Sequence, residues 1–323
     1  YATIPQYDEL NKLFFQVLAR RPESRTAAIQ QKYGPVPYLN SSLFEPTELA
    51  VLPDGRVLFL ERRGKAKLYD PASGQLSIAA EFDLYTEFEY GLMGLALDPN
   101  FRQNNWIYIF YSPVDSSVNR LSRFTFKNDT LDVTTEKVIL DVKSQREICC
   151  HTGGSIAFGP DGLLYVSTGD NSTPFNEPGA KFVNSGFGPM NDIPGHQQYD
   201  ARRSSANTND LRGKILRIRV NEDGSYDIPE GNLFPADGDK SRPEIYVMGN
   251  RNPYRISVDQ KNSTLYWGEV GPDASNDSLG TRGPRGYDEV NQARKAGNFG
   301  WPLFVGNNYA YRAYDYETGK SGE

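Results

Sequence analysis

The chain has 323 residues, with 35 Lys and Arg against 41 Asp and Glu and a net charge of −6. This acidic balance disfavours nucleic-acid binding, which depends on a surplus of basic side chains facing phosphates. No apolar run reaches the roughly 18 residues of a membrane span, so no transmembrane segment is expected. The 17 Phe, 20 Tyr, 30 Gly and 21 Pro are typical of a turn-rich all-β domain and argue against disorder.

Residues 1–40 differ in pattern from the rest of the chain. Apolar residues recur at helical spacing between positions 7 and 18, and Gly34, Pro35 and Pro37 follow. This pattern predicts a short N-terminal helical segment that acts as a linker or cap. The remainder, residues 41–323, is expected to form a second domain.

From residue 43 onward, one layout recurs four times. Each copy predicts a β-hairpin, with a strand, a turn rich in Pro, Asp or Gly, and a second strand. The first strands are centred on Leu49, Leu95, Ile156 and Ile256. Further strands follow each hairpin, and such a repeat is typical of β-propeller blades. We therefore predict an all-β propeller with about four blades in this chain, and we expect further blades to complete it.

The spacing of the repeats also predicts a long insertion in the third blade, at about residues 171–209. In a propeller, the loops that enter the innermost strands share one face. Phe44, Tyr90, His151 and Arg251 each precede such a strand. We therefore expect a polar site on this face, assembled from residues that are far apart in sequence.

Two rare residue types narrow the chemistry of that site. His151 and His196 are the two histidines, and Cys149 and Cys150 are the two cysteines, which excludes a His-rich or Cys-based metal site. His196 lies in the insertion and is expected to be exposed. Two interpretations of the cysteines remain open. They are either two reduced small side chains in the interior, or a vicinal disulfide that stiffens the loop leading to His151.

Several segments of the chain resemble those of one known family, and they occur in the same order. They are 91–101 (GLMGLALDPNF), 151–154 (HTGG), 169–170 (GD), 211–218 (LRGKILRI), 249–253 (GNRNP), 269–272 (EVGP), 287–291 (YDEVN) and 297–302 (GNFGWP). Across residues 43–308 the chain resembles the soluble glucose/sorbosone dehydrogenases, quinoproteins with a six-bladed β-propeller. The resemblance implies pyrroloquinoline quinone and Ca²⁺ as cofactors.

The function implied by this resemblance is oxidation of an aldose-type sugar at C1 to the lactone. Hydride passes to pyrroloquinoline quinone with the help of Ca²⁺. An electron acceptor, such as a cytochrome c domain or protein, would reoxidise the cofactor. The resemblance also implies a periplasmic or extracellular location.

The resemblance assigns roles to individual residues. His151 matches the general base that takes the proton from the C1 hydroxyl. Arg251 matches the guanidinium that contacts the quinone oxygens and stabilises charge developing there. The remaining cofactor contacts that it implies are Tyr90, Asp170, Asn252, Tyr254 and Asp288, and the calcium ligands are Glu289 and the backbone carbonyls of Gly271 and Pro272.

Two positions depart from the family pattern. Tyr254 stands where a glutamine is expected after Arg-Asn-Pro, and Cys150 stands where an aspartate is usual before the histidine. Two other functions therefore remain open. One is a non-catalytic propeller that binds a protein or glycan, for which His151 is dispensable. The other is a calcium-dependent lactonase-type hydrolase, which needs several oxygen ligands around one calcium ion. The central carboxylates that the sequence could supply for this are Glu48, Glu89 and Asp288.

Overall fold

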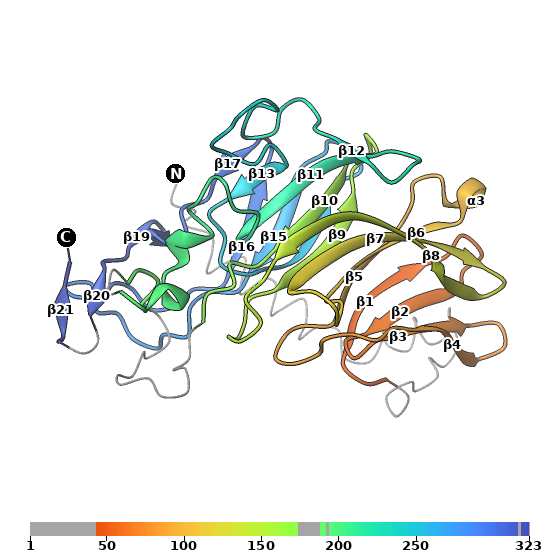
Figure 1. Cartoon of the computed structure of the whole chain (residues 1–323), viewed down its shortest axis with the longest axis horizontal. Coiled ribbons are helices and arrows are strands. Elements are labelled where there is room, and N and C mark those ends of the chain that lie inside the picture. The colour runs from red at the N-terminus through yellow and green to blue at the C-terminus, as the bar shows by residue number, and fades with distance from the viewer. Residues whose placement is uncertain (1–42, 174–187, 192–193, 316–317, 323) are drawn as a thin grey trace, which may run out of the picture. The chain divides into compact units, whose positions relative to one another are not determined.

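The computed structural model describes residues 43–173, 188–191, 194–315 and 318–322. The chain divides into two compact units, residues 1–43 and residues 44–323. The predicted N-terminal helical segment lies outside the described residues. The second unit is an all-β propeller arrangement of four blades (Figure 1).

The first two blades are four-stranded antiparallel sheets with the strands in sequence order, as hairpin repeats dictate. Blade 1 contains β1 (Pro46–Val51), β2 (Val57–Glu61), β3 (Lys65–Asp70) and β4 (Gln75–Glu81). Blade 2 contains β5 (Leu92–Leu97), β6 (Trp106–Tyr111), β7 (Val118–Lys127) and β8 (Thr130–Lys143). A one-turn helix, α3 (Phe101–Asn104), joins β5 to β6.

The third blade contains the long insertion. Its strands are β9 (Gly153–Phe158), β10 (Leu164–Thr168), β11 (Lys214–Val220) and β13 (Ile245–Met248). The predicted insertion at 171–209 lies between β10 and β11, which confirms its position. The described part of it contains two short 3₁₀ turns, Gln197–Tyr199 and Ala201–Arg203. The small strand β12 (Tyr226–Asp227) pairs with β11, and β17 (Gly297–Asn298) adds to β13 in parallel.

The fourth blade has three strands in the described part of the chain, β14 (Pro253–Val258), β15 (Leu265–Glu269) and β16 (Glu289–Ala293). Two small hairpins follow. They are β18 (Phe304–Val305) with β19 (Tyr309–Ala310), and β20 (Tyr314–Asp315) with β21 (Lys320–Ser321). All four predicted strand centres fall in the first strand of a blade, β1, β5, β9 and β14, as the repeat predicted.

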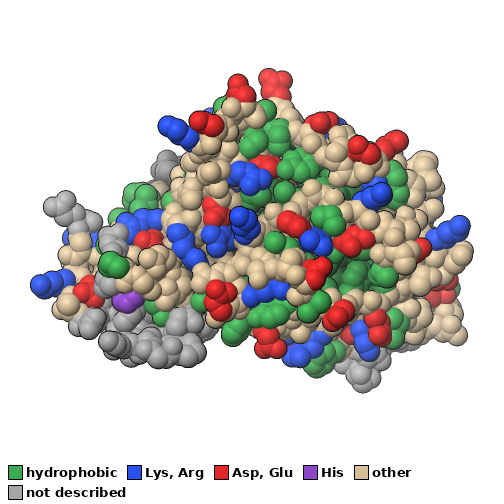
Figure 2. Space-filling view, viewed as in Figure 1, with side chains coloured by type: hydrophobic (Ala, Val, Ile, Leu, Met, Phe, Trp, Pro, Cys, Tyr) green, Lys and Arg blue, Asp and Glu red, His purple; other side chains and the backbone are tan. Residues whose placement is uncertain are grey.

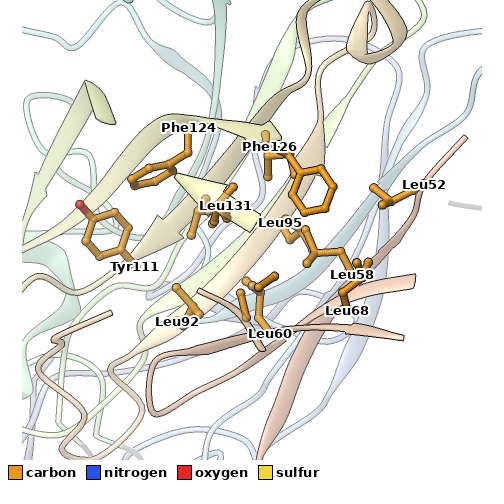
Figure 3. Packing of buried hydrophobic residues seen from close by; sticks show 14 of the residues in the cluster. Leu52, Leu58, Leu60, Leu68, Leu92, Leu95, Tyr111, Phe124, Phe126 and Leu131 are labelled. Atoms are coloured by element: carbon orange, nitrogen blue, oxygen red, sulfur yellow. The ribbon is translucent and has the colours of Figure 1, made fainter. Parts of the chain in front are cut away.

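The hydrophobic core lies between neighbouring blades. Leu58 and Leu60 of blade 1 pack against Leu92, Leu95 and Phe124 of blade 2 (Figure 3). Equivalent clusters join blade 2 to blade 3 and blade 3 to blade 4. Each blade therefore depends on its neighbour to bury its apolar face.

The first strands of successive blades also lie side by side, with β1 next to β5, β5 next to β9, and β9 next to β14. Across this group, the Arg255 guanidinium of β14 donates a hydrogen bond to the Thr47 carbonyl of β1. The loops that precede these strands are thereby gathered on one face. No helix in the described part of the chain is long and apolar enough to cross a membrane.

The surface of the molecule carries both signs of charge. Figure 2 shows Lys and Arg side chains interspersed with Asp and Glu over the face in view, with no continuous basic area. The acidic composition therefore comes with a mixed distribution of charge on this face.

Candidate functional site

A buried histidine–aspartate pair forms the centre of the site. Nδ1 of His151 lies 2.8 Å from Oδ1 of Asp170, and the two residues are 4% and 0% exposed. His151 enters blade 3 and Asp170 leaves the second strand of the same blade. The loop before β9 and the loop after β10 lie at the same end of blade 3, so the two side chains are in contact although they are 19 positions apart.

Glycines allow the two segments to approach so closely. Gly153 has φ +63°, which disfavours any side chain, and a Cβ at Gly169 would overlap the His151 carbonyl. His151 itself has φ +54°, a left-handed conformation that is uncommon outside glycine. Such conformations persist where the surroundings enforce them, and they concentrate at functional sites.

The Asp170 carboxylate is fixed by other donors besides the histidine. Ser172 donates from its backbone N–H at 2.8 Å and from its hydroxyl at 2.9 Å, and Trp301 donates its indole N–H at 2.7 Å. Burial alone would raise the pKa of Asp170, but the charge and hydrogen bond of His151 and the charge of Arg251 hold this pKa below its usual value.

The ionised carboxylate sets the tautomer of the imidazole. It accepts the Nδ1 hydrogen of His151, so that in the neutral imidazole the free lone pair is on Nε2. Nε2 has no hydrogen-bond partner among the residues that the structure describes. The arrangement therefore presents an oriented base.

Arg251 and Asn252 lie beside this pair. The Arg251 carbonyl accepts the backbone N–H of Asp170 at 2.7 Å, and the Asn252 side-chain oxygen accepts that of Gly153 at 2.9 Å. The Arg251 guanidinium donates to the Val270 carbonyl at 3.0 Å. The predicted residues of blades 3 and 4 are thus brought together by hydrogen bonds from the main chain of blade 3.

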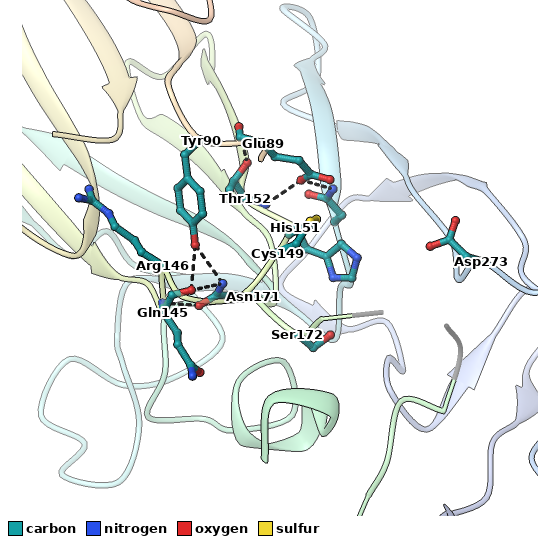
Figure 4. Close-up of a disulfide and its surroundings, with 12 residues drawn as sticks. Glu89, Tyr90, Gln145, Arg146, Cys149, His151, Thr152, Asn171, Ser172 and Asp273 are labelled. Carbon is teal, nitrogen blue, oxygen red and sulfur yellow. Dashed lines mark hydrogen bonds between the residues drawn. A yellow bond between two sulfur atoms is a disulfide. The ribbon is translucent and has the colours of Figure 1, made fainter. Parts of the chain in front are cut away.

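Glu89 of the loop before β5 also reaches this group. Its carboxylate accepts the Thr152 backbone N–H at 3.2 Å and the Asn252 amide at 3.4 Å (Figure 4). A half-buried carboxylate is therefore hydrogen-bonded to Thr152, the residue that follows His151. The sequence predicts Glu89 only as one of three central carboxylates, and its place directly before Tyr90 is the signal for this position.

Tyr90 and Tyr254 have different surroundings. Tyr90 is fully buried, and its hydroxyl donates to the Gln145 carbonyl at 3.2 Å and accepts from the Asn171 amide (Figure 4). In this position Tyr90 supports the loop of His151. Tyr254 is 37% exposed and lies under the Arg255 guanidinium. A cofactor contact for either ring stays a prediction.

The segment predicted to hold calcium is organised by hydrogen bonds to acidic side chains. The Gly271 backbone N–H donates to Asp288 at 2.8 Å. The Pro272 carbonyl accepts the Ala274 N–H at 2.8 Å, and Glu289 accepts from the Asn291 amide at 3.0 Å. Among the described residues, no three His, Cys, Asp or Glu side chains converge as a metal site. A calcium ion here would rely on backbone carbonyls.

A small cavity of about 20 Å³ lies between the segments 249–253 and 269–272. This volume is about that of one water molecule. Nδ2 of the buried Asn250 has no hydrogen-bond partner among the described residues. The polar and charged side chains that line the cavity include those of Asn250, Arg251, Glu269, Glu289 and Asn291.

Glu269, the last residue of β15, is a buried acid of this region. Burial raises its pKa to about 8, the facing Glu289 adds to this effect, and the backbone N–H groups of Asn252 and Arg251 oppose it. Glu269 and Trp301 both belong to motifs noted in the sequence, but neither had been given a role. Only the folded chain shows that they contact the Arg251–Asn252 segment and Asp170.

Cys149 and Cys150, immediately before His151, form a disulfide (Figure 4). Of the two interpretations left open by the sequence, the structure supports the vicinal disulfide. Cys150 is 6% exposed and Cys149 is half-buried.

The fold and this site define a β-propeller with an oriented histidine base at the entrance of its innermost strands. Residues 43–322 match the model of the family described as glucose/sorbosone dehydrogenase. The chain belongs to this family. A second family model, a domain of unknown function, matches residues 1–62.

Three relatives illustrate the range of proteins that the chain resembles. Quinoprotein glucose dehydrogenase B of Acinetobacter calcoaceticus is 29% identical over 87% of this chain and 56% of its own length. The mouse Hedgehog-interacting protein is 26% identical over 68% of this chain and 31% of its own length. The solved structure of a PQQ-bound aldose sugar dehydrogenase from Streptomyces coelicolor has a TM-score of 0.60, with 25% identity, and the match covers 82% of this chain and 64% of that one.

The chain is shorter than these relatives. It spans 56–64% of the length of three of the curated proteins that it matches.

Proposed function

We propose that this chain carries the sugar-oxidising site of a quinone-dependent dehydrogenase that converts an aldose at C1 to the lactone. The observation that carries the proposal is the oriented base. Nδ1 of His151 is held by Asp170 at 2.8 Å, and Nε2 is free among the described residues. A base in this state can accept the proton of the C1 hydroxyl while the C1 hydrogen leaves as hydride.

The residues present fit a polar, electron-accepting ligand. Arg251 supplies a guanidinium that donates to the Val270 carbonyl at 3.0 Å and to the exposed Asp273 carboxylate at 3.3 Å, and the neighbouring Asn250 has a buried amide nitrogen with no partner among the described residues. Arg251 and Asn252 would hold the quinone oxygens, and the carbonyls of Gly271 and Pro272 would hold Ca²⁺. When bound, pyrroloquinoline quinone with Ca²⁺ supplies the acceptor for the two electrons.

The chain's own residues do the remaining work. Asp170 keeps the proton of His151 on Nδ1 and stabilises the imidazolium that forms when Nε2 takes the substrate proton. Glu89 places an acceptor beside His151 that suits sugar hydroxyl groups. An electron-accepting partner and a periplasmic or extracellular location belong to the same proposal.

The proposal is tested by titrating pyrroloquinoline quinone and Ca²⁺ into the full-length protein and following dye reduction over a panel of aldoses. His151→Ala should abolish sugar-dependent reduction, because it removes the oriented Nε2 that accepts the substrate proton. His196→Ala, in the insertion, is the matched control and should keep activity. Dye reduction that survives in His151→Ala would rule out the assigned base.

A second function is favoured by one observation, the match to the Hedgehog-interacting protein. In that case the propeller binds a protein or glycan, the quinone does not bind, and His151→Ala leaves partner affinity unchanged. The lactonase-type alternative is not pursued, because residues 43–322 match the family described as glucose/sorbosone dehydrogenase.

A further inference from the structure

We propose that Glu269 is a positioning residue that fixes the main chain of Arg251 and Asn252 and thereby places both side chains for ligand binding. The proposal rests on the function proposed above for Arg251 and Asn252. It assigns to Glu269, the last residue of β15, a role that the motif alone does not reveal.

The first observation is the number of donors that converge on one carboxylate. Oε1 of Glu269 accepts the backbone N–H of Arg251 at 2.7 Å and that of Asn252 at 2.6 Å. Oε2 accepts the indole N–H of Trp267 at 3.2 Å. Glu269 is 8% exposed, so water replaces none of these bonds easily.

The second observation is where the fixed main chain leads. The Arg251 carbonyl accepts the N–H of Asp170 at 2.7 Å, and the Asn252 carbonyl accepts that of Val270 at 3.1 Å. One carboxylate therefore lies between the histidine–aspartate pair, the Arg251–Asn252 segment and the segment predicted to hold calcium. Loss of Glu269 would free two N–H groups in the peptide segment that joins these parts.

The third observation explains why an acid is required at this position. Either protonation form of a carboxyl group can accept all three N–H groups, because both oxygens keep a lone pair. A glutamine would still accept at Oε1, but its amide group would face the Trp267 indole N–H, donor against donor. Glu269→Gln therefore keeps size and shape while it disrupts the network.

The experiment compares Glu269→Gln with Glu244→Gln in the full-length protein. Glu244 is also buried, at 3% exposed, and accepts from Tyr226 and Arg242 in blade 3, away from the site. Two readouts are used, amide hydrogen exchange at Arg251 and Asn252, and the dissociation constant of pyrroloquinoline quinone with Ca²⁺.

For Glu269→Gln we expect faster exchange at Arg251 and Asn252 and an affinity for the quinone lower by about tenfold, because the amide that opposes the Trp267 N–H pulls Oε1 away from the two backbone donors. Glu244→Gln should show neither change, although both variants lose some thermal stability. In the double variant Glu269→Gln/Trp267→Phe the opposing donor is gone, so part of the affinity should return.

The outcomes separate the two proposals. Unchanged exchange at both amides in Glu269→Gln would overturn the positioning role. So would faster exchange with unchanged quinone affinity. If the parent protein binds no quinone, the proposed function fails, and selective exchange at Arg251 and Asn252 still tests whether Glu269 fixes that segment. If Glu269→Gln does not fold, the double variant supplies the same two readouts.

Discussion

At the scale of single residues, the site depends on how completely Asp170 is satisfied. Its two oxygens accept from His151, Ser172 and Trp301, and all four residues are buried. Trp301 is 131 positions away from Asp170, so a distant segment helps to orient the histidine base. The histidine was predictable from its glycine-rich motif, but the tryptophan contact was not, because nothing in the spacing links the two segments.

Asp170→Asn should therefore impair catalysis more than folding. The asparagine amide would face the Ser172 and Trp301 donors, or present a donor to Nδ1 of His151 and favour the wrong tautomer. We expect a fall in kcat of about 10²- to 10⁴-fold, as for other aspartates that orient a catalytic histidine. Steady-state kinetics measures it, and ¹⁵N spectra of the imidazole report the tautomer independently.

The control for this variant is Asp98→Asn. Asp98 follows β5 at the end opposite Tyr90 and accepts from Tyr108 at 3.0 Å. Its replacement should leave kcat unchanged. An Asp170→Asn enzyme with normal kcat and an unchanged imidazole tautomer would show that Asp170 does not orient His151.

The cysteine pair gives a second prediction at this scale. Because Cys149 and Cys150 are joined, the unfolded but unreduced protein should contain no alkylatable thiol, and reduction should expose two. Mass spectrometry after alkylation measures both states. Two alkylated cysteines without reductant would restore the alternative of two free thiols.

At the scale of elements, a buried lysine of β11 connects the insertion of blade 3 to the sheet. Nζ of Lys214, the first residue of β11, donates to the carbonyls of Ser204, Ser205 and Arg212 at 2.8–2.9 Å. The side chain is fully buried. The position of the insertion was evident from the repeat spacing. Its attachment was not, because a lysine in a strand pattern usually lies in solvent.

Lys214 should make stability depend on pH. Burial lowers its pKa to about 7, with a smaller effect from the charge of Arg212, while the Asp210 charge opposes the fall. Between about pH 7 and the model-peptide pKa of about 10.4, the unfolded chain holds a proton that the folded chain has released. The contribution of Lys214 to folding therefore rises with pH across this window.

Urea denaturation of the wild type and Lys214→Met at several pH values between 7 and 10 tests this reasoning. As the pH increases, the free energy of unfolding of the wild type should increase relative to that of the variant. The exposed Lys261→Met is the control, and its curve should run parallel to the wild type. A constant difference between wild type and Lys214→Met would contradict the buried titration.

At the scale of the whole molecule, cohesion comes from the interfaces between blades. The sequence predicted the blades well, because hairpin periodicity and turn residues are local signals. It predicted less of the site, since Glu89, Glu269 and Trp301 act through contacts between blades or distant segments. Such contacts depend on how the blades pack against one another, and the sequence of a single repeat does not predict that packing.

Leu60→Ala tests the role of these interfaces in stability. Leu60 of β2 is fully buried in the cluster that joins blades 1 and 2, so its truncation removes apolar contacts and leaves a cavity. We expect a loss of about 2–5 kcal/mol, typical of buried leucines. Val290 of β16, 87% exposed, provides the contrast, because Val290→Ala should change stability by no more than about 0.5 kcal/mol. Thermal and urea denaturation measure both variants, and a Leu60→Ala protein as stable as Val290→Ala would show that blade 1 does not depend on blade 2 for its folding.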